Sequence, residues 1–262
     1  MQDVLLKIID HKREELKSYP FPADIEAVAK STERKTISMS RSISTSRKGG
    51  IIAEFKRRSP SKGWINEAAN PVEIVAGYSA AGAAACSVLT NEEFFGGSIE
   101  HLKMARTVAG SMPLLRKEFI IDPRQIYEAR VAGADAVLLI AACLTVEECR
   151  ALAEVAHSVD LEVLLEIHSE AELSHLNEFI DMLGVNNRNL GSFVTDIENS
   201  FRLAKRMREE GRDVVLVSES GIEQSETIKR LQGVGFGGFL IGETFMKTEA
   251  PAERLTELIS QL

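Results

Sequence analysis

The sequence predicts one (β/α)8 barrel, a closed ring of eight parallel strands with a helix after each, preceded by an N-terminal helical extension. Three observations predict this fold. Short runs rich in Val, Ile and Leu occur eight times, and longer amphipathic segments separate them. The runs begin about 20 to 33 residues apart, which suits one strand, one helix and two short loops. The length of 262 residues is also usual for one such barrel.

The expected strands are almost continuously apolar, which indicates burial on both faces and therefore a parallel sheet. They are Ile51–Phe55, Ala84–Leu89, Leu114–Phe119, Ala136–Ile140, Val163–Ile167, Leu183–Asn186, Val214–Ser218 and Gly238–Gly242. Eight such units can also form an open, doubly wound sheet. That fold favours a glycine-rich dinucleotide loop after the first strand, where this chain has Lys56-Arg57-Arg58-Ser59-Pro60. The closed barrel is the better prediction.

The segments between strands have helix signals at their ends. We expect helices at Pro71–Ala81, Pro123–Ala132, Val146–Ser158 and Asp196–Glu210. Pro71 and Pro123 stand where the first helical turn tolerates a missing N–H. The Ala-Gly-Ala sequences at 81–83 and 132–134 indicate helix exits that lead into the next strand.

Residues 1–49 form the extension. They begin with an amphipathic helix and continue into a stretch rich in Ser, Thr and Arg, and we expect them to pack over the barrel. No linker or repeat suggests a second domain, so residues 1–262 are predicted to form a single barrel domain rather than two small ones.

The composition restricts the partners and the compartment. A balance of 31 basic and 39 acidic residues, a net charge of −8, argues against nucleic acid or a membrane surface as the main partner. There is no apolar run of roughly 18 residues, and the charged amino terminus does not match a secretion signal. Cys86, Cys143 and Cys149 are too irregularly spaced for a disulfide framework or a zinc site. We expect a cytoplasmic monomer or weak homo-oligomer.

Charged residues end several of the apolar strands. In barrel enzymes the chemistry lies at the carboxyl ends of the strands. Alternation puts Glu54 and Lys56 on one face of the first strand, while Lys117 ends the third and Glu166 the fifth. Each alone is equally well explained as a structural ion pair at a strand rim. Together, on strands that meet at one mouth, they favour a catalytic cluster.

Other strand-end residues are predicted to have a structural role or are given no role at this point. Arg116 and Glu118 lie on the opposite face from Lys117, and we expect them to pair with the surrounding helices. The sixth strand finishes in Asn186-Asn187-Arg188.

Glycines follow the last two strands. The seventh ends Ser218-Glu219-Ser220-Gly221-Ile222, and the eighth ends Leu240-Ile241-Gly242-Glu243. Glycine lets an anion approach backbone N–H groups, and barrels frequently bind phosphate with these two loops. The alternative is that the glycines serve only tight turns. We predict a phosphate site.

The histidines and loop aromatics are less informative. None of the five histidines has a metal-like spacing, so no metal site is predicted. Trp64 and the Phe94-Phe95 pair lie in the first two loops, where they either cover an aromatic ligand or serve packing.

These strand-end motifs, in this order, resemble those of the indole-3-glycerol phosphate synthase family, TIM barrels with extra N-terminal helices over the mouth. The resemblance covers about residues 50–260. The matching segments are 51–61, 88–90, 94–98, 117–120, 134–140, 165–168, 184–190, 218–222 and 240–243. It implies a cofactor-free lyase of tryptophan biosynthesis. Its small phosphorylated substrate, 1-(2-carboxyphenylamino)-1-deoxyribulose 5-phosphate, closes a ring and loses CO₂ and water.

The resemblance also implies site residues. They are Lys117, Glu166, Lys56, Glu54, Asn186 and Ser220 for catalysis; Ser59, Gly221, Gly242 and Glu243 for phosphate; and Pro60, Leu89, Phe95, Phe119, Leu138 and Phe193 for the aromatic pocket. Lys117 would be the general acid on the carbonyl oxygen, and Glu166 would handle a proton in the dehydration. Glu54 would orient and charge-balance the lysines. Lys56 would pair with the substrate's carboxylate or phosphate, or act as a second acid.

The chain departs from the family pattern at three places. Glu118 and Asn189 stand where the family usually has Asp, and the stretch from Glu166 to Asn186 looks one residue short. None of these changes affects the implied catalytic residues, so we expect an active enzyme.

Two other functions remain open. Phosphoribosylanthranilate isomerase, another phosphate-binding barrel, uses a Cys/Asp pair at strand ends, whereas Cys86 lies in mid-strand and Cys143 beyond the fourth strand. A non-catalytic barrel used for ligand binding or assembly would be expected to have lost one of the charged strand-end residues, and all are present.

Overall fold

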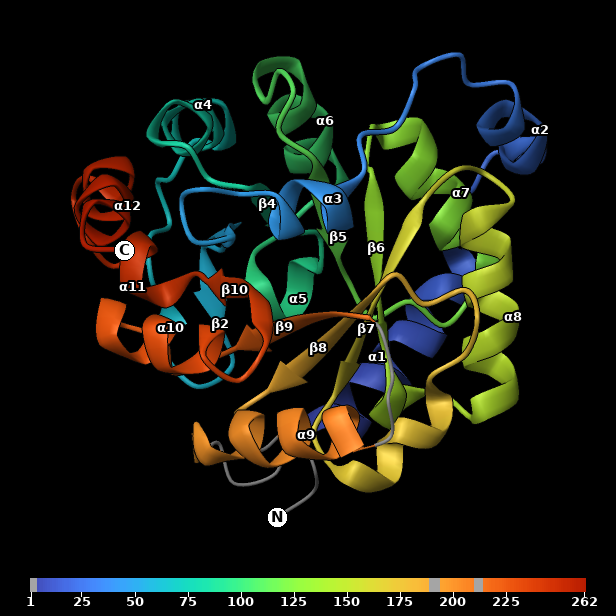
Figure 1. The fold of residues 1–262 in the computed structure, drawn as a ribbon. Coiled ribbons are helices and arrows are strands. Elements are labelled where there is room, and N and C mark those ends of the chain that lie inside the picture. Colours follow the sequence, from blue (N-terminus) through green and yellow to red (C-terminus); the bar gives the residue numbers. More distant parts are fainter. Residues whose placement is uncertain (1–3, 189–193, 210–213) are drawn as a thin grey trace.

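The computed structural model describes residues 4–188, 194–209 and 214–262. Its eight parallel strands close into a barrel in the order β1-β10-β9-β8-β7-β6-β5-β4 (Figure 1). The strands are β1 (Ile51–Phe55), β4 (Ala85–Leu89), β5 (Leu114–Lys117), β6 (Ala136–Ile140), β7 (Glu162–Ile167), β8 (Met182–Asn186), β9 (Val215–Glu219) and β10 (Phe236–Ile241). The predicted TIM barrel is therefore confirmed, with each strand within two residues of its expected position.

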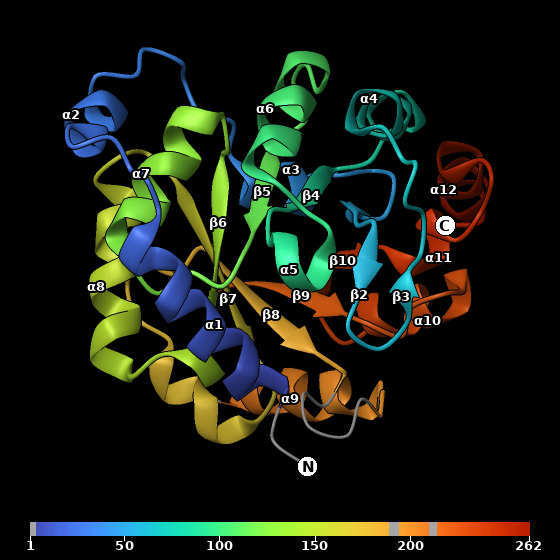
Figure 2. The same ribbon diagram turned by 180° about the vertical axis from the view of Figure 1, so that it is seen from behind.

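Helices surround the barrel between consecutive strands (Figures 1 and 2). They are α4 (Pro71–Ala81), α6 (Ile99–Val108), α7 (Pro123–Ala132), α8 (Val146–His157), α9 (Glu198–Glu209), α10 (Ser225–Gln232) and α12 (Pro251–Ser260). The crossover from β7 to β8 holds only the 3-10 helix η2 (Glu170–His175). Short elements lie in the loops at the mouth: the hairpin β2 (Arg58–Ser59) and β3 (Gly63–Trp64), and the helices α5 (Glu92–Phe95), η1 (Ala141–Cys143) and α11 (Glu243–Met246).

Local sequence accounts for the helix ends. Asn70 and Asp122 cap the first turns of α4 and α7, each followed by the expected proline. Gly82 and Gly133 end the same helices with φ angles of 92° and 94°, the left-handed conformation that glycine adopts without strain. The helix exits predicted from the two Ala-Gly-Ala sequences are confirmed.

Two apolar layers make the core. Strand residues that point outward, such as Ile51 and Phe55, pack beneath the helices. Residues that point inward, such as Ile52, Leu115 and Leu164, fill the barrel interior. Because side chains alternate along a strand, the polar residues that follow the inward positions by two are directed toward the mouth.

The extension has three separate helices: α1 (Val4–Ser18), α2 (Ile25–Lys30) and α3 (Met39–Ser44). α1 lies at the mouth. α2 packs on α7, and α3 covers the opposite end of the barrel (Figures 1 and 2). Met39 and Ile43 of α3 are buried against the residues of the barrel interior. α2 and α3 are therefore placed differently from the expected cover over the mouth, because their apolar faces fill gaps at the side and bottom.

Within the described residues, no helix has the length and apolar character needed to cross a membrane.

Candidate active site

A pocket of about 440 Å³ opens at the carboxyl ends of the barrel strands. It brings together the side chains that the sequence analysis assigned to the site. All of them except Phe193 line this pocket: Glu54, Lys56, Ser59, Pro60, Leu89, Phe95, Lys117, Phe119, Leu138, Glu166, Asn186, Ser220, Gly221, Gly242 and Glu243. Phe193 lies outside the described residues.

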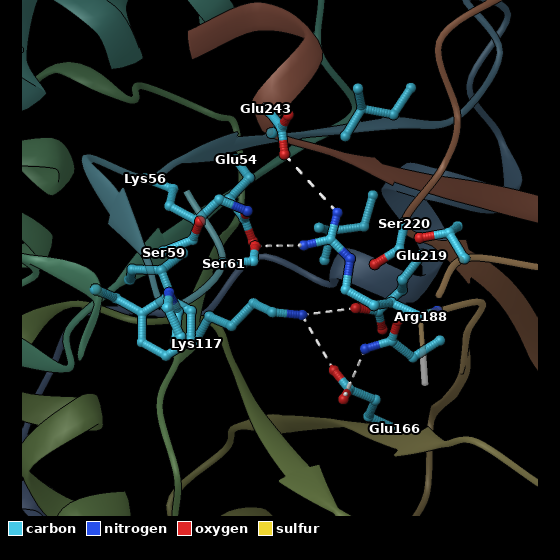
Figure 3. A pocket seen from close by; sticks show the side chains of 18 of the residues that line it. Glu54, Lys56, Ser59, Ser61, Lys117, Glu166, Arg188, Glu219, Ser220 and Glu243 are labelled. Carbon is cyan, nitrogen blue, oxygen red and sulfur yellow. Dashed lines mark hydrogen bonds and ion pairs between the residues drawn. The ribbon is translucent and has the colours of Figure 1, made fainter. Parts of the chain in front are cut away.

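Lys117 lies at the centre of the pocket between two carboxylates (Figure 3). Its Nζ is 2.6 Å from Glu219 Oε2 and 3.2 Å from Glu166 Oε2. The three residues follow inward-facing apolar positions of β5, β9 and β7 by two residues, so the pleat of each strand directs them to the same place. The Lys117 side chain is only 15% exposed.

The members of this cluster, Lys117, Glu166 and Glu219, shift one another's pKa values in different directions. Burial alone would lower the pKa of Lys117, but the carboxylates, Glu219 foremost, outweigh it and hold that pKa above its usual value. Burial and the charge of Glu166 raise the pKa of Glu219. For Glu166, Lys117 overcomes burial and lowers the pKa. Two carboxylates around one ammonium group thus have opposite shifts, a pattern typical of acid–base sites.

A second ion pair lies beside this cluster. Lys56 Nζ is 2.6 Å from Glu54 Oε1, and the Glu54 side chain is buried. Glycines make room for the carboxylates. A Cβ at Gly242 would overlap the carboxylate of Glu54, and one at Gly184 would overlap that of Glu219. The two glycines therefore set the depth at which these acids lie.

Asn186 and the turn after β9 complete the polar wall. Asn186 Nδ2 donates to Glu166 Oε1 at 3.1 Å. Ser220 and Gly221 both have positive φ angles, 68° and 76°, and this conformation is uncommon for serine. The buried side chain of Asn187 donates to the Ser220 carbonyl at 3.1 Å, which holds the turn in place.

The opposite side of the pocket carries hydroxyl, backbone and cationic groups. The Ser59 hydroxyl is buried and has no hydrogen-bond partner among the described residues. Arg188 donates to Ser61 Oγ at 3.3 Å, and it lies 3.8 Å from Glu243 Oε2. Lys62 is also 3.8 Å from Glu243. An anion placed here meets an unused donor and two nearby cations.

An apolar surface faces the cluster. Phe95 and Phe119 lie with ring centroids 6.0 Å apart, and Pro60, Leu89 and Leu138 extend this surface. Trp64, by contrast, is 46% exposed, packs beside Arg57 and Arg58, and does not line the pocket.

Sequence reasoning missed several lining residues. Glu219 is the most important, because the expected seventh strand ended at Ser218. The alternation from Val217 to Glu219 was the signal that could have found it. Arg188 was noted only as part of a strand end. Leu5 and Ile8 of α1 also line the pocket, and only the apolar face of that helix pointed to them.

The outward-facing neighbours of Lys117 pair with surrounding helices, as expected. Arg116 binds Glu128 of α7 at 2.8 Å, and Glu118 binds Lys12 of α1 at 3.4 Å. The second pair fastens α1 to the mouth.

The closed parallel barrel, with a lysine–glutamate cluster in one pocket at the carboxyl ends of its strands, places this protein among the TIM-barrel enzymes. A profile for indole-3-glycerol phosphate synthase matches residues 5–258. The chain belongs to the indole-3-glycerol phosphate synthase family. It is accordingly a carbon–carbon lyase of tryptophan biosynthesis whose reaction is a decarboxylating ring closure.

Individual relatives of this chain agree with the assignment to this family. The indole-3-glycerol phosphate synthase of Bacteroides thetaiotaomicron is 53% identical over 264 residues, covering 100% of both chains. That of Polaromonas naphthalenivorans is 41% identical over 267 residues, again covering 100% of both.

Solved structures share the fold alone. A chain of the tryptophan synthase complex of Pyrococcus furiosus superposes with a TM-score of 0.60 at 12% identity, covering 82% of this chain and 97% of that one. The 3-hexulose-6-phosphate synthase of Salmonella typhimurium gives 0.59 at 14% identity, with 80% and 98% covered.

Proposed function

We propose that Lys117 is the general acid that starts the family's reaction on 1-(2-carboxyphenylamino)-1-deoxyribulose 5-phosphate. The observation that carries this proposal is the position of its ammonium group, which Glu166 and Glu219 hold from two other strands inside one pocket. The ring carbon that bears the carboxylate attacks the ketone carbon, and Lys117 gives a proton to the carbonyl oxygen. A proton donor at this oxygen makes the ketone a better electrophile.

Two further steps complete the reaction. CO₂ leaves with its bonding electrons returned to the aromatic ring, which restores the ring. The new hydroxyl then leaves as water after protonation, while Glu166 takes the proton from the adjacent carbon, and the indole double bond forms. The enzyme gives two protons and takes one, so each turnover draws one proton from solvent. The lowered pKa of Glu166, set by Lys117 against burial, keeps it ionised for this role.

The remaining polar residues are proposed to bind and orient. Lys56, paired with Glu54, is the cation for the substrate's carboxylate, and proton donation in the dehydration is its alternative role. Asn186 holds Glu166 and, with Ser220, hydrogen-bonds the hydroxyl groups of the substrate. Two lysines facing buried glutamates keep the site close to neutral, which lowers the cost of burying these charges.

The phosphate is proposed to lie by Ser59 and the backbone N–H groups of Gly221, Gly242 and Glu243. The buried Ser59 hydroxyl, which has no hydrogen-bond partner among the residues that the structure describes, supports this position. The apolar wall of Phe95, Phe119, Pro60, Leu89 and Leu138 would then hold the aromatic ring in attack geometry.

Ser59→Ala tests the phosphate position. We expect KM to rise about tenfold with kcat nearly unchanged, because a hydrogen bond to a charged group is worth about 1.5–3 kcal/mol in ground and transition state alike. Steady-state kinetics would measure both constants. Ser44→Ala, an exposed serine of α3, is the matched control. A Ser59→Ala enzyme with a wild-type KM would place the phosphate elsewhere.

A turnover assay tests the function directly. The purified protein, mixed with the carboxyphenylamino-deoxyribulose phosphate, should produce indole absorbance and fluorescence and one CO₂ per indole. Folded protein that gives neither signal would contradict the proposal. Conversion of phosphoribosylanthranilate instead would favour the isomerase.

We also propose a cytoplasmic, single-domain protein that is a monomer or a weak homo-oligomer, with α1 as part of its active site. Three unpaired cysteines support a reducing compartment, and the contact of Lys12 with Glu118 supports α1 as part of the barrel unit. Sedimentation over a range of concentrations would report the oligomeric state.

A further inference from the structure

His168 is a largely buried titratable residue that the proposed chemistry does not use. It follows the last residue of β7, two positions after Glu166, so the alternation of the strand brings its ring to the side of that carboxylate. Two hydrogen bonds hold its main chain in place. The N–H donates to Glu172 Oε2 at 2.5 Å, and the carbonyl accepts from Asn199 Nδ2 at 3.1 Å. The side chain is only 12% exposed.

The imidazole bridges two carboxylates. Its Nε2 is 3.4 Å from Glu166 Oε1, and its Nδ1 is 3.7 Å from Glu172 Oε2 of η2. Both contacts are ion pairs, since neither ring nitrogen forms a hydrogen bond with the residues that the structure describes. His168 does not line the pocket, so any effect on the reaction passes through Glu166.

The opposite edges of the Glu166 carboxylate thus have different partners. Oε2 faces Lys117 and the pocket, at 3.2 Å. Oε1 faces away from Lys117, toward Asn186 at 3.1 Å and His168 at 3.4 Å. A carboxylate held on both edges cannot rotate away from the reacting atoms.

Charge counting indicates that the imidazole is protonated. Four acids surround this part of the barrel, Glu54, Glu166, Glu172 and Glu219, whereas the ammonium groups paired with them in the described part of the chain are those of Lys56 and Lys117. A third cation reduces the excess of negative charge in this group, which favours the imidazolium form.

We propose that His168, held by Glu172, is a positioning residue that orients Glu166 and keeps it ionised for its proton transfer. This inference rests on the role proposed above for Glu166.

The directions of the pKa shifts of His168 and Glu172 agree with this proposal. Burial opposes the charge on His168, but Glu172 and Glu166 outweigh it and raise the pKa of the imidazole, with a smaller effect from Glu219. The pKa of Glu172 is lowered, since its bonds to His168 overcome burial.

Three other titratable groups of the described residues interact with Glu166. They are Lys117 of β5, Glu219 of β9 and the Cys143 thiol of η1, whose pKa is raised by burial so that it stays neutral. Without an imidazolium beside it, Glu166 loses one of its two cationic neighbours, and its pKa must rise.

The first test compares His168→Gln with His168→Met. Glutamine keeps an N–H donor without the charge, and methionine removes both. Because Glu166 then binds a proton more readily, we expect the acidic limb of kcat to move to higher pH in both variants. At the pH optimum the methionine variant should lose about tenfold in kcat, as for a misplaced catalytic group, while glutamine restores most of it. KM should stay near the wild-type value in both. A wild-type pH profile in both variants would overturn the proposal.

The second test uses two glutamates of the same 3-10 helix. Glu172→Gln should shift the acidic limb in the same direction as the His168 variants, whereas the exposed Glu170→Gln should leave it unchanged. Identical profiles for these two variants would contradict the part assigned to Glu172. If instead Glu166→Gln proved fully active, the proposed function of Glu166 would be wrong, and this outcome is distinct from a failure of His168.

Discussion

Replacement of Lys117 by methionine or by arginine is expected to lower kcat by about 10²-fold or more, the usual size of a general-acid contribution. Arginine keeps the positive charge between Glu166 and Glu219 but does not release a proton at neutral pH. Loss of activity in both variants therefore identifies proton donation, and not charge alone, as the function of Lys117. Single-turnover kinetics with the carboxyphenylamino-deoxyribulose phosphate would measure the chemical step.

The two Lys117 variants should differ in stability. Methionine leaves Glu166 and Glu219 buried without their shared cation, which raises the pKa of these carboxyls in the folded state. A group whose folded pKa is raised contributes stability at low pH that is lost as the pH rises. The Tm of the methionine variant should therefore fall from acidic to neutral pH relative to that of the arginine variant. Lys103→Met, at an exposed lysine of α6, controls for loss of a charge. An arginine variant with more than about a tenth of wild-type kcat would contradict the general-acid role.

Glu166→Gln is expected to separate the two products of the reaction in time. Glutamine keeps the size of the side chain and its hydrogen-bonding capacity toward Asn186, but it cannot take a proton. Since Glu166 is assigned to the dehydration, CO₂ release should continue in a first turnover, while indole formation slows by about 10²-fold or more. Quenched-flow measurement of CO₂ beside stopped-flow indole absorbance would show the accumulated indoline.

Glu170→Gln is the matched control for that experiment, since it makes the same change on the exposed side of η2. If the rates of CO₂ release and of indole formation fell equally in Glu166→Gln, the carboxylate would act in ring closure, before the carbon–carbon bond to CO₂ breaks.

Most of the barrel could be predicted from local patterns. The runs of Val, Ile and Leu placed all eight strands, and Pro71, Gly82, Pro123 and Gly133 placed helix ends, because each signal depends on a few neighbouring residues. The prediction was weaker where the chain leaves a strand. β5 ends at Lys117 and not at Phe119, because Glu118 turns outward to bond Thr90, Asn91 and Lys12.

The site was predicted less completely than the fold. Its lysines were found because a charge at the end of an apolar run is a local anomaly. Glu219 was missed because its expected strand was ended one residue early, and His168 was set aside because none of the histidines has a metal-like spacing. The short crossover after β7 was noticed, but the 3-10 helix that brings Glu172 to His168 has no clear sequence signal.

Sequence alone determined which residues could form strands and helices, and which strand ends carry charge, because side-chain alternation and helix capping act over one to four residues. Only the tertiary structure decided which charges meet. Lys117 reaches Glu166 and Glu219, 49 and 102 residues further along the chain, because the closed barrel brings the ends of β5, β7 and β9 to one mouth. The physical reason is that proton affinity in this site depends on distances across the barrel, and these are set by closure and burial.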